Sequence, residues 1–236
     1  MIVAILGGGA NRTDPVLAAR WRRLGLPAER VPAAGAHSRL GATDVALGRL
    51  DVLRTLDGVE PGLLDLLLLE RGGRPVLNGA AGLLAAHDKA RTAVALALAR
   101  LPHPRTAVLR DAGEALPLPP PLVLKPRFGS WGADVVRCGT EREARAQLRL
   151  LADRRWFRRH GVLVQELVDA PSSDLRVVVA GGTAIGAIRR TAAHGEWRTN
   201  TALGAGRTRP PSARSASTSP ASTCSRCRAG ATSCSR

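Results

Sequence analysis

The sequence predicts a mixed fold, in which an α/β half is followed by an α+β half built on antiparallel hairpins. Three observations predict it. Met1–Leu6 is an apolar run that enters a glycine turn and a capped helix; Leu122–Val136 reads as strand, glycine loop and strand; and two apolar runs between Asp174 and Arg190 are joined by a Gly-Gly turn. With 236 residues, of which 44% are hydrophobic, the chain can build one large domain or two small ones.

Residues 1–78 are expected to form a Rossmann-like domain. The strand Met1–Leu6 runs into three glycines, and Thr13-Asp14-Pro15 then supplies a cap and a first-turn proline for a helix that ends near Leu24. Arg12 stands at the last glycine position of the dinucleotide fingerprint, so the opening predicts α/β structure without predicting a dinucleotide. Later elements are expected at Asp44–Leu50 (strand), Leu63–Arg71 (helix) and Arg74–Leu77 (strand).

From Gly79 onward the pattern changes, and apolar strands alternate with turns and single helices. The expected elements are a helix at His87–Arg100, a strand at Arg105–Leu109, the hairpin Leu122–Cys138, a helix from a Thr140 cap to about Ala152, a strand at Val162–Val168, and a hairpin of Asp174–Ala180 with Thr183–Arg190.

The glycine loop of the first hairpin has the composition of a phosphate site. Lys125 ends the first strand, and Gly129 and Gly132 flank Ser130 in the loop that follows. Glycines let a backbone approach an anion closely, and an ammonium group supplies a compact charge beside it. Only two of the 35 basic residues are lysines, Lys89 and Lys125, so a lysine in this loop is informative. The alternative is an ordinary hairpin with a surface lysine.

The formal charge of +16 raises the question of nucleic acid. Its distribution argues against that partner, because six arginines and no acid lie in residues 207–236, and the remaining charge follows no basic stripe. Aromatic side chains for base stacking are scarce, with four Trp, two Phe and no Tyr.

No apolar run approaches the ~20 residues that span a bilayer, and no signal peptide is evident, so no membrane partner and a cytoplasmic location are expected. The four cysteines form no disulfide framework. Cys224 and Cys227 have zinc-knuckle spacing without a following histidine, so no residue is assigned as a metal ligand.

A series of short motifs in chain order resembles the ATP-grasp superfamily, and within it the RimK-like α-L-glutamate ligases. The resemblance covers about Arg74 to Gly206. It implies an incomplete two-lobed ATP-grasp fold after the Rossmann-like domain, with residues 79–165 as the small lobe that carries the phosphate-binding loop and residues 166–206 as the start of the C-terminal lobe. The motifs are His87-Asp88-Lys89, Val123-Leu124-Lys125-Pro126, Gly129-Ser130-Trp131-Gly132, Val164-Gln165-Glu166-Leu167, Asp174-Leu175-Arg176, Arg190, and Glu196-Trp197-Arg198-Thr199-Asn200.

The resemblance implies a role for each matching residue. Lys89 and Lys125 would reach the phosphates of ATP, beneath a cover formed by Gly129, Ser130 and Gly132. Gln165-Glu166-Leu167 would be the hinge that reads adenine through backbone groups, and Asp174 would lie near the ribose. The catalytic groups facing the reacting phosphate and carboxylate would be Arg190, Arg198 and Asn200.

The implied reaction is ATP-dependent ligation of a carboxylate to an amine through an acyl phosphate, with glutamate as an amino acid of the kind added. Carboxylate and amine substrates, ATP and Mg²⁺ would be its partners and cofactors, and a homo-oligomer is compatible with it. Negative charge builds on transferring oxygens in both steps, so cationic groups should cluster there. A closing loop would keep water from the activated acid.

The chain departs from the family after Gly206. Residues 207–236 form a basic, low-complexity tail that lacks the aspartate and the Glu-x-Asn that hold Mg²⁺ in the family, and the tail is expected to be disordered. The genetic code permits an out-of-frame origin. Ala221–Arg236, read one base earlier, can encode Gly-Ile-Asp-Leu-Leu-Pro-Leu-Pro-Gly-Gly-Arg-Tyr-Val-Val-Leu-Glu, which restores the missing strand pair up to its glutamate.

This chain is therefore expected to be impaired as a ligase or only marginally folded. Three alternatives stay open: a natural basic tail, an ATP-binding module without catalysis, and, less favoured, a basic nucleic-acid-binding protein.

Overall fold

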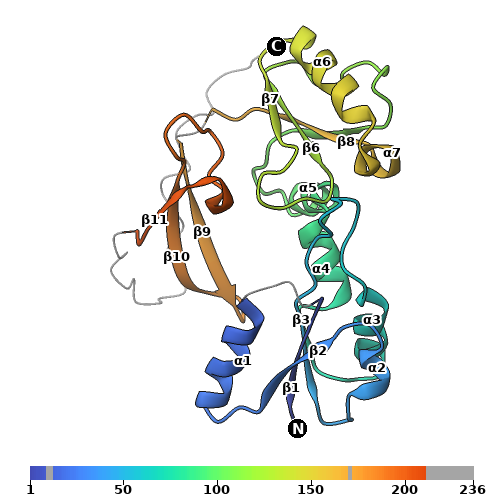
Figure 1. Cartoon of the computed structure of the whole chain (residues 1–236), viewed down its shortest axis with the longest axis vertical. Coiled ribbons are helices and arrows are strands. Elements are labelled where there is room, and N and C mark those ends of the chain that lie inside the picture. The colour runs from blue at the N-terminus through green and yellow to red at the C-terminus, as the bar shows by residue number, and fades with distance from the viewer. Residues whose placement is uncertain (9–12, 170–171, 211–236) are drawn as a thin grey trace, which may run out of the picture.

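The computed structural model describes residues 1–8, 13–169 and 172–210, and their strands form three separate sheets (Figure 1). The N-terminal sheet is parallel, with the order β2-β1-β3-β4. Its strands are β1 (Val3–Gly7), β2 (Ala28–Pro32), β3 (Val45–Gly48) and β4 (Val76–Leu77). Its helices are α1 (Thr13–Arg23), α2 (Ala36–Arg39) and α3 (Leu63–Arg71).

The central strand β1 explains how these helices are arranged. Ala4 and Leu6 pack into a cluster with residues of α2 and α3, whereas Ile5 packs with Ala18 of α1. Successive strand side chains point to opposite faces, so an uninterrupted apolar run requires a cover on both. Figure 1 shows α1 on one side of the sheet and α2 and α3 on the other.

Two consecutive helices lead away from this sheet, where the sequence predicted one. They are α4 (Ala80–His87) and α5 (Lys89–Leu98), and Asp88 separates them with an extended backbone. The Asp88 carboxylate accepts hydrogen bonds from the amides of Ala90 and Arg91, so it caps α5. The predicted start at His87 was therefore wrong, because a capping aspartate begins a new helix.

The second sheet is antiparallel, with the order β5-β8-β6-β7, and it carries two helices. Its elements are β5 (Thr106–Leu109), β6 (Leu122–Pro126), β7 (Val136–Cys138), α6 (Glu141–Ala152), α7 (Arg155–His160) and β8 (Val162–Glu166). The predicted strand–loop–strand at Leu122–Cys138 is confirmed as β6 and β7. The second strand begins only at Val136, because Trp131, Gly132 and Asp134 have positive φ angles that an extended strand excludes.

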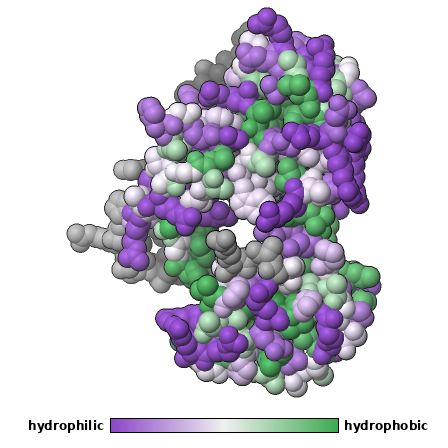
Figure 2. All heavy atoms as spheres, in the orientation of Figure 1, coloured by the Kyte–Doolittle hydropathy of each residue, from purple (hydrophilic) through white to green (hydrophobic). Residues whose placement is uncertain are grey.

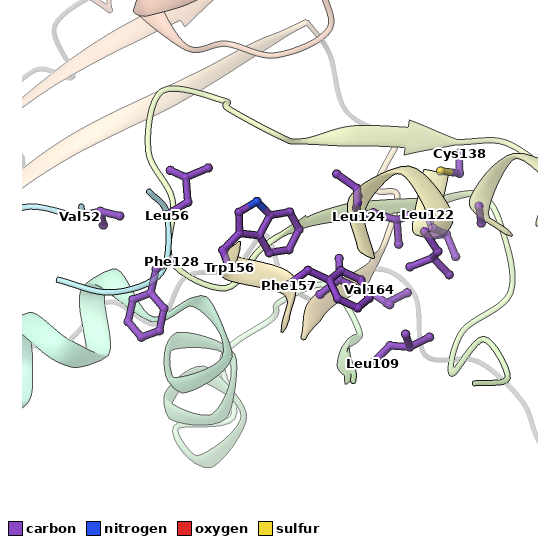
Figure 3. Packing of buried hydrophobic residues seen from close by; sticks show 14 residues of the cluster. Val52, Leu56, Leu109, Leu122, Leu124, Phe128, Cys138, Trp156, Phe157 and Val164 are labelled. Carbon is purple, nitrogen blue, oxygen red and sulfur yellow. The ribbon is translucent and has the colours of Figure 1, made fainter. Parts of the chain in front are cut away.

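The core of this second lobe includes side chains from the N-terminal half. Val52 and Leu56 lie in the same buried cluster as Phe128, Trp156 and Val164 (Figure 3). The loop that carries them is held by a buried carboxylate. Asp57 accepts from Thr55 Oγ1 at 2.5 Å and pairs with Arg155 Nε of α7 at 2.7 Å. Both neighbours hold the pKa of Asp57 below its usual range, with Thr55 the larger cause, so the carboxylate stays ionised and fixes the two halves together.

The third sheet is the hairpin of β9 (Ser173–Ala180) and β10 (Thr183–Thr191), extended by the short β11 (Gly206–Thr208) and preceded at that end by a 3₁₀ turn, η1 (Thr201–Leu203). Its apolar side chains are largely exposed, including Val177, Val179 and Ile185. The first residues of the predicted disordered tail belong to β11, where Arg207 lies opposite Arg190 of β10 in the antiparallel strand register. For these residues the prediction was wrong, and residues 211–236 lie outside those described.

Several short elements escaped the sequence analysis, namely β2, α2, α7, η1 and β11. They are three to six residues long, which is too short for periodicity to separate from a loop. Among the described residues, no helix is long and apolar enough to cross a membrane.

Two leucines of α6 test which face of this helix stabilises the second lobe. Leu148 is 0% exposed and Leu150 is 69% exposed. Leu148→Ala is expected to lower the free energy of unfolding by about 2–5 kcal/mol, because it removes buried methyl groups and leaves a cavity. Leu150→Ala should change it by less than about 0.5 kcal/mol. Urea denaturation measures both, and equal losses would contradict the packing described.

Candidate functional site

A cleft of about 370 Å³ opens between the second sheet, the glycine loop and the segment before η1. It brings together residues that are far apart in the sequence, from α5, β6, β8 and residues 197–200. Figure 2 shows the molecule hollowed between its lobes on the face that it presents. The predicted site residues that line the cleft are Lys89, Lys125, Gly129, Ser130, Gly132, Gln165, Glu166, Leu167, Arg198 and Asn200.

Lys89 enters the cleft from the first turn of α5. Its ammonium donates to the carbonyl oxygen of Gly129 at 2.8 Å. Burial, and then the nearby charge of Lys125, lower the pKa of Lys89 to about 8. The neighbouring Asp88 is only 1% exposed, and both its oxygens accept from Arg127 at 2.7 Å. Asp88 offsets this fall in pKa only in part, because its carboxylate binds Arg127 rather than Lys89.

Lys125 reaches the cleft from the C-terminal end of strand β6. Its ammonium donates to Gln165 Oε1 of β8 at 2.6 Å, and Gln165 in turn donates to Thr106 Oγ1 at 2.7 Å. Burial lowers the pKa of Lys125 below its usual value. No ion pair found among residues 1–8, 13–169 and 172–210 includes Lys89 or Lys125. Two partly buried ammonium groups with neutral hydrogen-bond partners favour an anionic ligand.

The glycine loop owes its shape to left-handed backbone. Trp131, Gly132 and Asp134 have φ angles of 59°, 78° and 51°. A side chain at Gly132 would come within 2.9 Å of Leu203 Cδ1 and 3.1 Å of Asn200 Oδ1, so glycine is required for the close approach as well as for the turn. The loop also has an anchor in the second lobe, since Trp156 Nε1 donates to Asp134 Oδ2 at 2.7 Å.

Arg198 fastens the same loop from the opposite side of the cleft. Its Nη1 donates to the carbonyl oxygen of Gly132 at 2.9 Å, and its Nε and Nη2 bind the Glu196 carboxylate at 3.0 and 2.7 Å. This pairing, with Arg198 as the largest cause, lowers the pKa of Glu196 to about 2. The structure therefore shows Arg198 as a link between the loop and residues 196–200.

Two predicted residues lie apart from this cleft. Asp174 and Arg190 face each other across the β9–β10 register and form a two-bond ion pair. Thr199 Oγ1 also donates to Asp174, at 2.5 Å. Arg190 lines a neighbouring, more polar cleft of about 670 Å³, which shares Ser130, Trp131 and Asn200 with the first. Asp174 lines neither cleft.

Glu166 presents backbone rather than charge to the cleft region. Its carboxylate accepts from the amide of Arg105 at 2.8 Å and from Arg105 Nε at 2.6 Å. These bonds to Arg105 lower the pKa of Glu166. The carboxylate is therefore committed to the edge strand β5, and backbone groups and the Leu167 side chain remain to contact a ligand.

The sequence analysis missed several residues that line the cleft, including Trp131, Trp197 and Thr199. All three stand inside motifs that were recognised, so position within the motif was the available signal. The residues described contain no cluster of three or more His, Cys, Asp or Glu that could hold a metal ion. The two ammonium groups and the glycine loop of the described residues fit a phosphate-bearing ligand. Residues 211–236, which make up most of the tail in which the family's metal carboxylates were sought, lie outside those described.

Comparison with known proteins identifies the family to which this chain is similar. The family described as the RimK-like ATP-grasp domain matches residues 86–225. The tetrahydromethanopterin:α-L-glutamate ligase of Methanosarcina acetivorans is 31% identical over 180 residues, which cover 69% of this chain and 56% of the relative. The α-aminoadipate–LysW ligase LysX of Saccharolobus solfataricus is 32% identical over 148 residues, or 61% of this chain and 53% of the relative. The chain thus spans about half the length of these curated relatives.

A solved structure shares the fold. The RimK-domain ATP-grasp protein of Sphaerobacter thermophilus superposes with a TM-score of 0.57 at 25% identity, over 81% of this chain and 73% of that protein. The predicted fold class, parallel and antiparallel sheets in an ATP-grasp arrangement, is confirmed.

The link between Arg198 and the glycine loop can be tested by hydrogen–deuterium exchange. Arg198→Lys is expected to increase exchange in residues 129–135, because lysine cannot bind Glu196 and the Gly132 carbonyl oxygen together in one fork. Arg189→Lys, on an exposed position of β10, is the matched control and should leave the loop unchanged. Equal exchange in the two variants would show that Arg198 does not hold the loop.

Proposed function

Because the chain belongs to the RimK-like ATP-grasp family, we propose that it carries the nucleotide site of an ATP-dependent ligase that joins a carboxylate to an amine through an acyl phosphate. One observation carries the proposal: two partly buried ammonium groups, Lys89 and Lys125, lie at a glycine loop and form no ion pair with a described residue. A polyphosphate supplies the missing negative charge, and the loop supplies backbone groups close to it.

The bound nucleotide would extend along the cleft. The triphosphate would lie between Lys89, Lys125 and the loop, and the adenine beside Gln165-Glu166-Leu167 at the end of β8. Support comes from the lining of one cleft by all of these residues. Lys125 would neutralise phosphate charge at a fixed position, since Gln165 holds its ammonium.

Arg198 and Asn200 would act at the mouth of the cleft, where they meet the glycine loop. Arg190 would act from the neighbouring cleft, with Asp174 orienting its guanidinium. In this arrangement Asp174 affects the nucleotide through Arg190 rather than through the ribose. Water would be kept from the activated acid by the loop and by Trp131, which borders both clefts.

The substrates are proposed from the relatives. Their names specify glutamate or α-aminoadipate as one substrate, and a pterin cofactor or the protein LysW as the other. We infer that an amino acid such as glutamate is joined here as well. Membership of a homo-oligomer and a cytoplasmic location stay predictions.

We also propose that the chain is impaired in turnover. The described residues hold no carboxylate cluster for Mg²⁺, and the apolar side chains of β9 and β10 are exposed. An ATP-binding module without catalysis is the second candidate. The lack of a carboxylate cluster among the described residues favours it. A nucleic-acid-binding protein would instead show affinity that falls steeply with salt and survives loss of Lys125.

An assay of ATP-dependent amide formation, with L-glutamate as the amine, separates these functions. We expect a version with the reading frame restored after Gly206 to turn over at least about 100-fold faster than this chain, because it regains the metal carboxylates that stabilise transferring phosphate. Nucleotide binding should be present in both and weakened about 10- to 100-fold by Lys125→Met. Equal turnover by the two versions would contradict impairment, and a Lys125→Met variant that binds ATP as well as the parent would contradict the site.

The pKa of Lys89 predicts how nucleotide affinity depends on pH. A bound phosphate stabilises the ammonium and raises its pKa above the value of about 8 in the free protein. Affinity for ATP should therefore be complete below pH 8 and fall as pH rises through 8, by at most about tenfold per unit. ATP-binding titrations at pH values between about 7 and 9.5 measure this dependence. The phosphates stay ionised throughout, because their second pKa is about 6. Lys89→Arg stays charged throughout and should give a flat profile; a flat profile for the parent would exclude Lys89 from the phosphate site.

A further inference from the structure

A separate cavity of about 470 Å³ opens at the carboxyl end of the N-terminal sheet. It lies where β3 and β4 end, and helix α4 closes it. Its lining includes Arg49, Asp51, Asn78, Leu83 and His87, and it shares no residue with the nucleotide cleft. In open parallel sheets, ligands bind outside the carboxyl ends of the strands. The position and size of this cavity are those of a small-molecule site.

Arg49 gives the cavity an oriented cation. Its Nε donates at 3.0 Å to Asp14, which is only 1% exposed and holds the guanidinium in place. Among the described residues, no other contact of the Arg49 guanidinium is found. The terminal Nη1 and Nη2 groups form a second edge of the guanidinium, which has the geometry to bind one carboxylate with two hydrogen bonds.

Hydrogen-bond acceptors face the same cavity. His87 donates from Nε2 to the carbonyl oxygen of Leu50 at 2.8 Å, which leaves its Nδ1 as an acceptor in the neutral ring. Asn78 uses its amide nitrogen toward Gly48 at 3.3 Å, which leaves its side-chain oxygen. Asp51 adds a carboxylate, of which one oxygen accepts from Val52. A cation beside acceptors matches a ligand that carries both a carboxylate and an ammonium group.

The rest of the wall is apolar, with Leu50, Leu83 and Ala86. It can contact the methylene groups of an amino-acid side chain. The cavity and the nucleotide cleft are linked along the chain by the junction between α4 and α5. His87 lines the cavity and Lys89 lines the cleft, with only the buried Asp88 between them.

We propose that this cavity binds the amino acid that serves as the amine substrate, with the carboxylate of the amino acid on Arg49 and its ammonium group toward Asp51 and Asn78. The inference rests on the proposed function for its role as a substrate site, but binding of an amino acid can be measured without turnover. A zwitterion is selected because a simple dicarboxylate would place a negative charge against Asp51, and a simple amine would leave Arg49 without a partner.

Equilibrium dialysis of the full chain with radiolabelled L-glutamate tests the proposal. Arg49→Gln should weaken L-glutamate binding at least tenfold, and Arg49→Lys should restore part of it, since lysine keeps the charge but not the fork. The matched control is Arg54→Gln, an exposed arginine of the same segment that lines none of these cavities; it should bind like the parent. Unchanged binding by Arg49→Gln, or no binding by the parent, would overturn the proposal.

Arg49→Gln removes the partner of the buried Asp14 and could therefore weaken binding by destabilising the fold. A second variant, which leaves Arg49 in place, separates the two effects. Asp51→Asn should weaken binding of L-glutamate at least fivefold and leave binding of glutarate, which lacks the ammonium group, unchanged or tighter. An equal loss for both probes would overturn the placement of the ammonium. ATP binding, measured on the same proteins, should stay within twofold of the parent. If the parent binds L-glutamate but not ATP, the proposed function fails while the amino-acid site stands; if it binds ATP but Arg49→Gln has no effect on L-glutamate, only the present inference fails.

Discussion

The site depends on an imbalance of charge that the fold maintains beneath the glycine loop. Lys89 and Lys125 are buried enough for their pKa values to fall, yet their hydrogen-bond partners are a carbonyl oxygen and an amide oxygen. Burying an ammonium without a counter-charge costs free energy, and an anionic ligand returns it. Of the nearby acids, Asp88 binds Arg127 and only partly offsets the fall in the pKa of Lys89, and Glu166 binds Arg105.

The surrounding structure keeps this arrangement in place. Strands β6 and β8 fix Lys125 opposite Gln165 through their antiparallel pairing, and Asp88 fixes Lys89 by starting α5. The glycine loop that follows β6 is held at Asp134 by Trp156 and at Gly132 by Arg198. The Asp57 contacts then tie the N-terminal sheet to α7. Each anchor comes from a different part of the chain, so the cleft needs all three lobes.

The sequence was a sufficient guide where one residue type has one physical role. The rarity of lysine identified both ammonium groups, and glycine at 132 marked the turn that only glycine allows. It was insufficient where a role depends on register or on a distant partner. Asp174 and Arg190 were assigned to different parts of a ligand, but the β9–β10 register pairs them. Arg198 lines the cleft, but the sequence did not indicate that Glu196 and the Gly132 carbonyl oxygen would bind its guanidinium. The break at Asp88 was missed because an Ala- and Leu-rich run looks continuous on either side of a capping aspartate.

A crystal structure of this chain with a non-hydrolysable ATP analogue tests the central claim most directly. The account predicts phosphate oxygens within hydrogen-bonding distance of the ammonium groups of Lys89 and Lys125, with the Lys89 bond to the Gly129 carbonyl oxygen replaced or shared. An analogue bound elsewhere, with both ammonium groups still on their neutral protein partners, would contradict it.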